Sequence, residues 1–246
     1  MQGRCTSKLG LQGLSRLAAA ILMSTATAER AEAVGGAFVV DNAEITMLNT
    51  CQVESWAAFA RNRDLTVSTT PACTVDVVKP IEFSAQFQRA RGGPVWLTSV
   101  TLQAKTILVP TEPMKLGVSV GRTFDLINDQ VTQSFVNVPV TFEVSEKIRI
   151  NTNVGHLRDH IANFHWLTWG GSLEWDFARS VTLVTELFGL VGRRPIDQPA
   201  VTDPRLQTGL RFKPTEQVDI DFIYGHNVTG VSTHWITVGL NVRFDR

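Results

Sequence analysis

Charged side chains recur at alternate positions within long apolar stretches of this sequence. That spacing places them on one face of a β-strand, with aliphatic residues on the other face. A charge that faces hydrocarbon at the middle of a bilayer costs about 2–4 kcal/mol, so we expect the charged rows to face inward. The residues expected to line the lumen are Glu54, Glu82, Lys105, Glu143, Arg149, Glu174, Asp176, Glu186, Arg211, Asp219, Asp221 and Arg243.

Acids outnumber bases in this set, so an open lumen would carry net negative charge and a modest preference for cations. Arg211, Asp219, Asp221 and Arg243 fall on three successive expected strands and predict a cross-strand ion network. Two interpretations stay open: the charges line a pore, or they form a polar plug that holds a narrow barrel shut.

Cysteine usage points to an oxidising compartment. Cys5 precedes the apolar core of an N-terminal leader, which leaves Cys51 and Cys73 in the exported chain. An even pair there predicts a disulfide, with two free thiols as the alternative. A hairpin turning at residues 62–64 would bring Cys73 back beside Cys51, which agrees with that pairing.

Histidines and serines raise a second kind of chemistry. His156, His160 and His165 cluster around one expected external loop, and Ser134 and Ser232 are near the same rim. A lipid hydrolase would need a Ser/His pair with an orienting polar group. No His-x-Ser spacing appears, so we favour solvent-facing histidines, and no enzyme activity is expected. Without a carboxylate or thiolate companion, we expect no metal and no cofactor.

The elements that position these residues are long amphipathic strands. In the last one His234, Ile236, Val238, Leu240, Val242 and Phe244 form an apolar row. About ten residues of this kind cross a bilayer when tilted, roughly twice the length of an average soluble strand. The expected strands are Gln52–Arg61, Leu65–Cys73, Val75–Arg89, Trp96–Val109, Leu116–Phe124, Ser134–Val144, Lys147–Leu157, Phe164–Phe177, Ser180–Arg193, Pro204–Lys213, Gln217–Asn227 and Thr233–Phe244.

These strands predict an all-β fold, a 12-stranded antiparallel transmembrane β-barrel, with ten strands as the alternative count. The strands of a soluble β-sandwich also alternate apolar and polar residues. In a soluble lipocalin-like barrel the apolar residues would face the lumen and the polar ones the outside, opposite to the arrangement expected here. Outward aromatics near strand ends, Trp169, Trp175, Phe177, Phe212 and Phe244, match interfacial girdles.

Three segments follow from these patterns. Residues 1–28 are expected to be a signal peptide, with Arg4, Lys8 and Arg16 before a short apolar core and a small-residue cleavage site. Residues 29–50 are expected to be a periplasmic lead-in, and 51–244 the outer-membrane barrel. Whether the lead-in plugs the lumen is left open. The expected partners are outer-membrane lipid, the barrel assembly machinery and a small-molecule solute. A formal net charge of +0 argues against nucleic acid.

Four short stretches carry a resemblance to a known family. Residues 51–56 (CQVESW), 61–64 (RNRD) and 71–73 (PAC), with the closing 235–244 (WITVGLNVRF), resemble the Gram-negative outer-membrane barrels called meta-pathway phenol-degradation or transporter-like proteins. The likeness covers most of the chain after residue 37. It implies an outer-membrane location and uptake of small, aromatic compounds, and it implies no catalytic residues. Such barrels usually end at the terminal aromatic, whereas Asp245 and Arg246 follow Phe244 here.

The sequence therefore predicts a porin-like channel or transporter for passive passage of small molecules, aromatic or hydrophobic compounds among them. A structural barrel with a closed lumen is the first alternative, and an outer-membrane lipid-modifying enzyme is the second.

Overall fold

The computed structural model describes residues 36–92, 94–193, 200–202, 204–229 and 233–245. The expected signal peptide lies outside these residues. The described part folds into β-strands, and none of its segments forms a helix long and apolar enough to cross a membrane. The strands are β1 (Thr50–Ala60), β2 (Leu65–Asp76), β3 (Pro80–Gly92), β4 (Val95–Val109), β5 (Met114–Asp125), β6 (Gln130–Ser145), β7 (Ile148–Asp159), β8 (Phe164–Ala178), β9 (Val181–Arg193), β10 (Ala200–Thr202), β11 (Arg205–Thr215), β12 (Val218–Asn227) and β13 (His234–Asp245).

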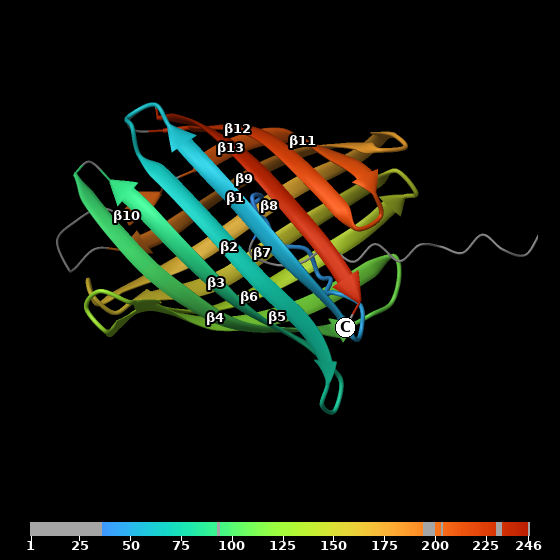
Figure 1. Cartoon of the computed structure of the whole chain (residues 1–246), viewed down its shortest axis with the longest axis horizontal. Coiled ribbons are helices and arrows are strands. Elements are labelled where there is room, and N and C mark those ends of the chain that lie inside the picture. The colour runs from blue at the N-terminus through green and yellow to red at the C-terminus, as the bar shows by residue number, and fades with distance from the viewer. Residues whose placement is uncertain (1–35, 93, 194–199, 203, 230–232, 246) are drawn as a thin grey trace, which may run out of the picture. The chain divides into compact units, whose positions relative to one another are not determined.

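All neighbouring strands pair antiparallel, and the sheet closes on itself (Figure 1). β13 pairs with β1 over the full length of the seam, from Thr50 opposite Asp245 to Ala60 opposite Trp235. β10 pairs with the end of β9, and β11 pairs with the earlier part of β9. These two of the thirteen strands therefore occupy a single position in the ring, next to β9. The result is a closed barrel of twelve positions, which confirms the predicted fold and rules out the ten-strand alternative.

The barrel has two distinct ends. The "turn end" carries the short connections after β2, β4, β6, β8 and β11, together with the start of β1 and the end of β13. The "loop end" carries the other connections. Strand boundaries match the sequence prediction closely at most positions. β6 begins at Gln130 instead of Ser134, and the short β10 was not predicted. In the second hairpin β2 continues to Asp76 and β3 begins only at Pro80. Proline has no backbone N–H to give to a ladder, which suits the first position of a strand.

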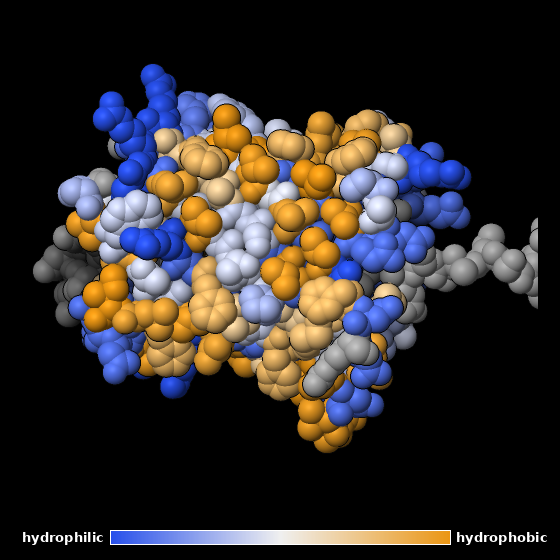
Figure 2. Space-filling view, in the orientation of Figure 1, coloured by the Kyte–Doolittle hydropathy of each residue, from blue (hydrophilic) through white to orange (hydrophobic). Residues whose placement is uncertain are grey.

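The outer surface of the barrel is apolar. Large hydrophobic side chains on the outward rows stand about half exposed, such as Phe222 at 56% and Ile236 at 56%. Their inward neighbours are buried, including Asp219, Asp221 and Thr237. Apolar side chains gather over the middle of the face in Figure 2, with hydrophilic ones towards its ends. This polar-in, apolar-out sense is that of a membrane barrel and opposite to that of a soluble lipocalin.

The first hairpin is fixed by a disulfide. Cys51 on β1 lies directly opposite Cys73 on β2, and the two sulfur atoms are bonded. The predicted pairing is thereby confirmed. The link joins strands at the seam of the barrel, beside the pairing of β1 with β13.

Candidate functional site: an occupied lumen

Residues 36–46, which we call the plug, lie inside the ring of strands. In Figure 1 this segment is the blue trace seen within the ring of strands, near β1. Most of its side chains are buried, with Ala43 at 0% exposure. Met47, Leu48 and Asn49 are exposed and lead from the plug into β1 at the turn end.

Inward carboxylates hold the backbone of the plug. A segment without strand partners must find acceptors for its N–H groups elsewhere, and ionised oxygens make strong ones. The bonds run from Ala37 N to Glu54 Oε1 (3.0 Å), from Val39 N and Val40 N to Glu186 (2.9 and 3.0 Å), and from Thr46 N to Glu82 Oε2 (2.8 Å). The Thr46 hydroxyl also donates to Glu82. Three residues predicted to line a pore therefore anchor the plug instead of facing open water.

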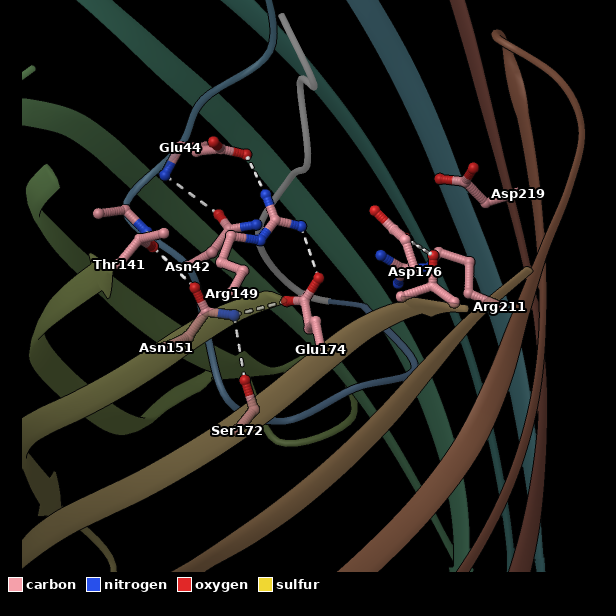
Figure 3. A network of polar contacts seen from close by, with 12 residues as sticks. Asn42, Glu44, Thr141, Arg149, Asn151, Ser172, Glu174, Asp176, Arg211 and Asp219 are labelled. Carbon is pink, nitrogen blue, oxygen red and sulfur yellow. Dashed lines mark hydrogen bonds and ion pairs between the residues drawn. The ribbon is translucent and has the colours of Figure 1, made fainter. Parts of the chain in front are cut away.

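The plug also brings its own acids to the bases of the wall. Asp41 Oδ1 accepts from Lys105 Nζ at 2.7 Å. Glu44 bridges Lys115 (3.0 Å) and Arg149 (3.2 Å), and Arg149 continues to Glu174 at 2.5 Å (Figure 3). These contacts place compensating charges inside a volume where an unpaired ion would be costly.

Neutral side chains extend this network along the wall. Thr141 Oγ1 accepts from the N–H of Ala43 (2.8 Å) and donates to Asn151 Oδ1 (2.8 Å). The Asn151 amide nitrogen then donates to Ser172 (3.0 Å) and to Glu174 (2.5 Å), as Figure 3 shows. The plug is thus joined by a continuous set of hydrogen bonds to β6, β7 and β8.

Two inward glycines make room for the plug. A Cβ added at Gly170 would lie 2.8 Å from Val40 Cγ2, and one added at Gly239 would lie 2.9 Å from the Ala37 side chain. Contacts that short are not tolerated, so any side chain at either position would displace the plug. The fit between wall and plug therefore depends on shape as well as on charge.

Two ion pairs near the seam join strands of the wall. Arg211 pairs with Asp221, its direct partner across β11 and β12 (2.9 and 3.2 Å). Arg243 pairs with Asp219. Each of the four residues of the expected network thus has an ion-pair partner within the set. The Arg211 guanidinium also stands 5.1 Å from the centre of the Phe38 ring.

All twelve residues predicted for the lumen occupy inward positions, but they fall into two groups. The buried ones are Glu54, Glu82, Lys105, Arg149, Glu174, Glu186, Asp219 and Asp221, and the half-buried ones are Glu143, Asp176, Arg211 and Arg243. Sequence reasoning missed Lys115, which the alternation would have included had the strand been started earlier. It also missed Asp41 and Glu44, which lie in a segment without periodicity.

A cavity of about 470 Å³ lies against the plug. Its walls combine amide side chains with aromatic and aliphatic ones, among them Gln86, Gln103, Asn137, Asn241, Phe135, Leu157 and Phe188. Gln103 Nε2 and Asn241 Oδ1 are buried and have no hydrogen-bond partner within the described residues. Buried polar atoms in native proteins are normally paired, so these two mark positions where a bound polar molecule would fit.

The serine and histidine cluster forms pairs at the loop end. Ser134 Oγ lies 2.9 Å from His160 Nε2, and His156 Nε2 lies 3.0 Å from His165 Nδ1. Within the described part of the chain, no carboxylate or amide contacts the other ring nitrogen of His160. No set of three or more His, Cys, Asp or Glu side chains among these residues is placed to hold a metal ion. Ser232 lies outside the described residues.

Solved barrels resemble this one in fold. The KdgM porin in complex with disordered oligogalacturonate has a TM-score of 0.60 at 9% identity, covering 78% of this chain and 99% of that one. The NanC porin has a TM-score of 0.59 at 8% identity, covering 77% and 98%. The COG4313 outer membrane channel from Pseudomonas putida F1 has a TM-score of 0.55 at 12% identity, covering 79% and 94%. The shared architecture is that of bacterial outer-membrane β-barrels.

Sequence comparison adds one assignment. No curated protein matches the chain. One family model does match, over residues 21–244, which is nearly the whole chain and includes the plug and every strand except the final residue of β13. The chain belongs to the family described as uncharacterised conserved protein UCP029691.

Proposed function

We propose that this protein is an outer-membrane channel for passive passage of small molecules, with residues 36–46 closing its lumen at rest. The observation that carries the proposal is the occupied polar lumen inside an apolar-faced barrel of porin-like fold. Barrel diameter grows with strand number, so a twelve-stranded lumen is wider than the filled interior of an eight-stranded barrel and narrower than the aqueous channel of a sixteen-stranded porin. In this chain the filling comes from its own N-terminal side.

Passage through such a barrel requires the plug to move. Glu54, Glu82 and Glu186 accept plug N–H groups, and Lys105 and Arg149 pair with plug acids. The cation preference expected from the acidic excess therefore belongs to the open state, in which these carboxylates face water. In the closed state they serve as anchors.

Neutral compounds with an apolar body are the proposed solutes. The cavity beside the plug presents aromatic and aliphatic walls. Charged residues on these walls already have partners: Arg211 pairs with Asp221, and Glu54 and Glu186 accept N–H groups of the plug. Binding sites of this kind fix a small ligand by apolar contact and a few polar groups. The likeness of the first hairpin and closing strand to the phenol-degradation barrels supports aromatic compounds among them.

Planar-bilayer conductance tests the channel, comparing the refolded mature chain with a variant that lacks residues 36–46. We expect rare or small openings from the intact chain and frequent discrete steps from the deletion variant. A salt gradient then reads ion selectivity from the reversal potential.

A closed structural barrel is the second candidate, favoured by the number of bonds between plug and wall. It predicts that the intact chain stays silent under all conditions, including an excess of neutral aromatic solutes. If the deletion variant folds, as judged by heat-modifiable migration in gels, and is also silent, the channel proposal is wrong.

A further inference from the structure

A row of polar and basic side chains crosses the outer face near the loop end. Arg122 on β5 lies opposite Ser134 on β6, Ser134 lies opposite Arg158 on β7, and Arg158 lies opposite His165 on β8. Side chains at such directly opposed positions are about 4.5–5.5 Å apart at their Cβ atoms. The four groups therefore form one short line on the surface.

This row belongs to the outward face of the barrel. The next outward positions towards the turn end are Val120, Val136, His156 and Leu167, also in direct register. Val120 and Leu167 are about half exposed. Apart from His156, the outward surface next to the row is apolar, and it ends at a line of groups that can bind an anion.

The row lacks its own counter-charges. Arg122, Arg158 and His165 are exposed, and within the described residues neither guanidinium has a carboxylate partner. Asp159, the nearest acid in sequence to Arg158, accepts the N–H groups of Ile161 and Ala162 instead. Neighbouring cations across strands repel each other, so an anion placed between them would stabilise this face.

His160 helps to define the centre of the row. Its Nε2 is hydrogen-bonded to Ser134 Oγ (2.9 Å), which fixes the hydroxyl between the two arginines. A hydroxyl, two guanidinium groups and an imidazole are the donors that hold a phosphate group. Ser134 and His160, which were considered above for a lipid hydrolase, therefore suit the binding of a phosphate group.

A hollow of about 500 Å³ begins at the same place. It lies on the outer face and is lined by Phe83, Leu102, Ala104 and Val120, with Arg122 and Ser134 also on its wall. An apolar hollow next to a phosphate-binding row has the two parts that match an amphiphile: a chain of hydrocarbon and an anionic head. A soluble phosphate would use only the row.

We propose that the row Arg122, Ser134, Arg158 and His165 and the adjoining hollow form a binding site for a phosphorylated lipid of the outer leaflet. The phosphate contacts the row, and an acyl chain lies in the hollow. The site rests on the proposed outer-membrane location but not on conduction, because it lies outside the lumen.

Binding of lipid A to the refolded mature chain in neutral detergent tests this site. The test variant is Arg122→Gln/Arg158→Gln. The control is Lys147→Gln/Arg179→Gln, which removes the same charge from exposed positions near the turn end. We expect the test variant to weaken lipid A binding by about tenfold or more, since two charge-assisted bonds are lost. The control should bind like the unmodified chain.

Two further ligands test separately whether the phosphate group and the acyl chain contribute to binding. Dephosphorylated lipid A should bind weakly to the unmodified chain, and inorganic phosphate alone should not compete at concentrations comparable with the lipid. Equal lipid A binding by the test and control variants would overturn the site, and so would phosphate that binds as tightly as the lipid. Arg122→Gln/Arg158→Gln should conduct like the unmodified chain, so a failure of the channel proposal is distinguishable from a failure here.

Discussion

Lys105 Nζ lies 2.7 Å from Asp41 Oδ1, and the lysine side chain has no exposure to water. The lysine belongs to β4 and the aspartate to the plug, so this contact joins wall and plug. Lys105 also faces Glu82 across β3 and β4, and Glu82 in turn accepts from Thr46. Lys105 therefore lies between a carboxylate of the plug and a carboxylate of the wall.

Asp41→Asn should loosen the plug and destabilise the barrel. Removing one member of a buried ion pair costs about 3–5 kcal/mol when the remaining charge has no other partner, and Glu82 beside Lys105 should reduce that figure. Urea unfolding in detergent measures the change. Asp76→Asn, at an exposed position where β2 ends, is the control and should leave the midpoint unchanged. Equal midpoints for both variants would contradict the anchoring role of Asp41.

Gly170→Val should expel the plug without changing any charge. Its side chain would occupy the space of Val40, while the barrel outside the lumen stays the same. We expect conductance close to that of the chain lacking residues 36–46. The adjacent Gly171→Val is the matched control, because a Cβ there meets nothing within 4 Å. Closed behaviour in both variants would show that displacing the plug does not open the lumen.

Reduction of the disulfide between Cys51 and Cys73 should lower stability. A link that closes a loop of this size, with a sequence separation of 22, contributes about 3 kcal/mol by restricting the unfolded chain. Cys51→Ser/Cys73→Ser should shift the urea midpoint downwards, and a reducing agent should have the same effect on the unmodified chain only. A reducing agent that also shifts the midpoint of the double variant would point to another cause.

Ion selectivity of the opened barrel should depend on its carboxylates. In the chain that lacks residues 36–46, Glu174→Gln/Glu186→Gln should lower the preference for cations, because both carboxylates face the lumen. Reversal potentials under a salt gradient measure this preference. Glu146→Gln, at an exposed turn, provides the comparison. Unchanged selectivity in the double variant would rule out these residues as the source.

The barrel could be predicted from the sequence because strand alternation is local. The alternation of polar and apolar residues that places Asp219 and Asp221 inward is visible in their own strand, without knowledge of the strands that pair with it. The position of Asp41 is different, since its contact with Lys105 exists only after the strands have closed around residues 36–46. No periodic pattern marks such a segment, and its role follows only from contacts between residues that lie far apart in the sequence. The lipid-facing row escaped prediction for the same reason, because it depends on the register of four strands.

The plug is tethered to the wall it closes by only Met47, Leu48 and Asn49. A short tether gives a segment a local concentration on the order of millimolar at its own binding site. Rebinding of a displaced plug is therefore intramolecular and independent of how much protein the membrane contains. Each opening should end by itself, and any solute that keeps the lumen open must compete with a ligand that never diffuses away.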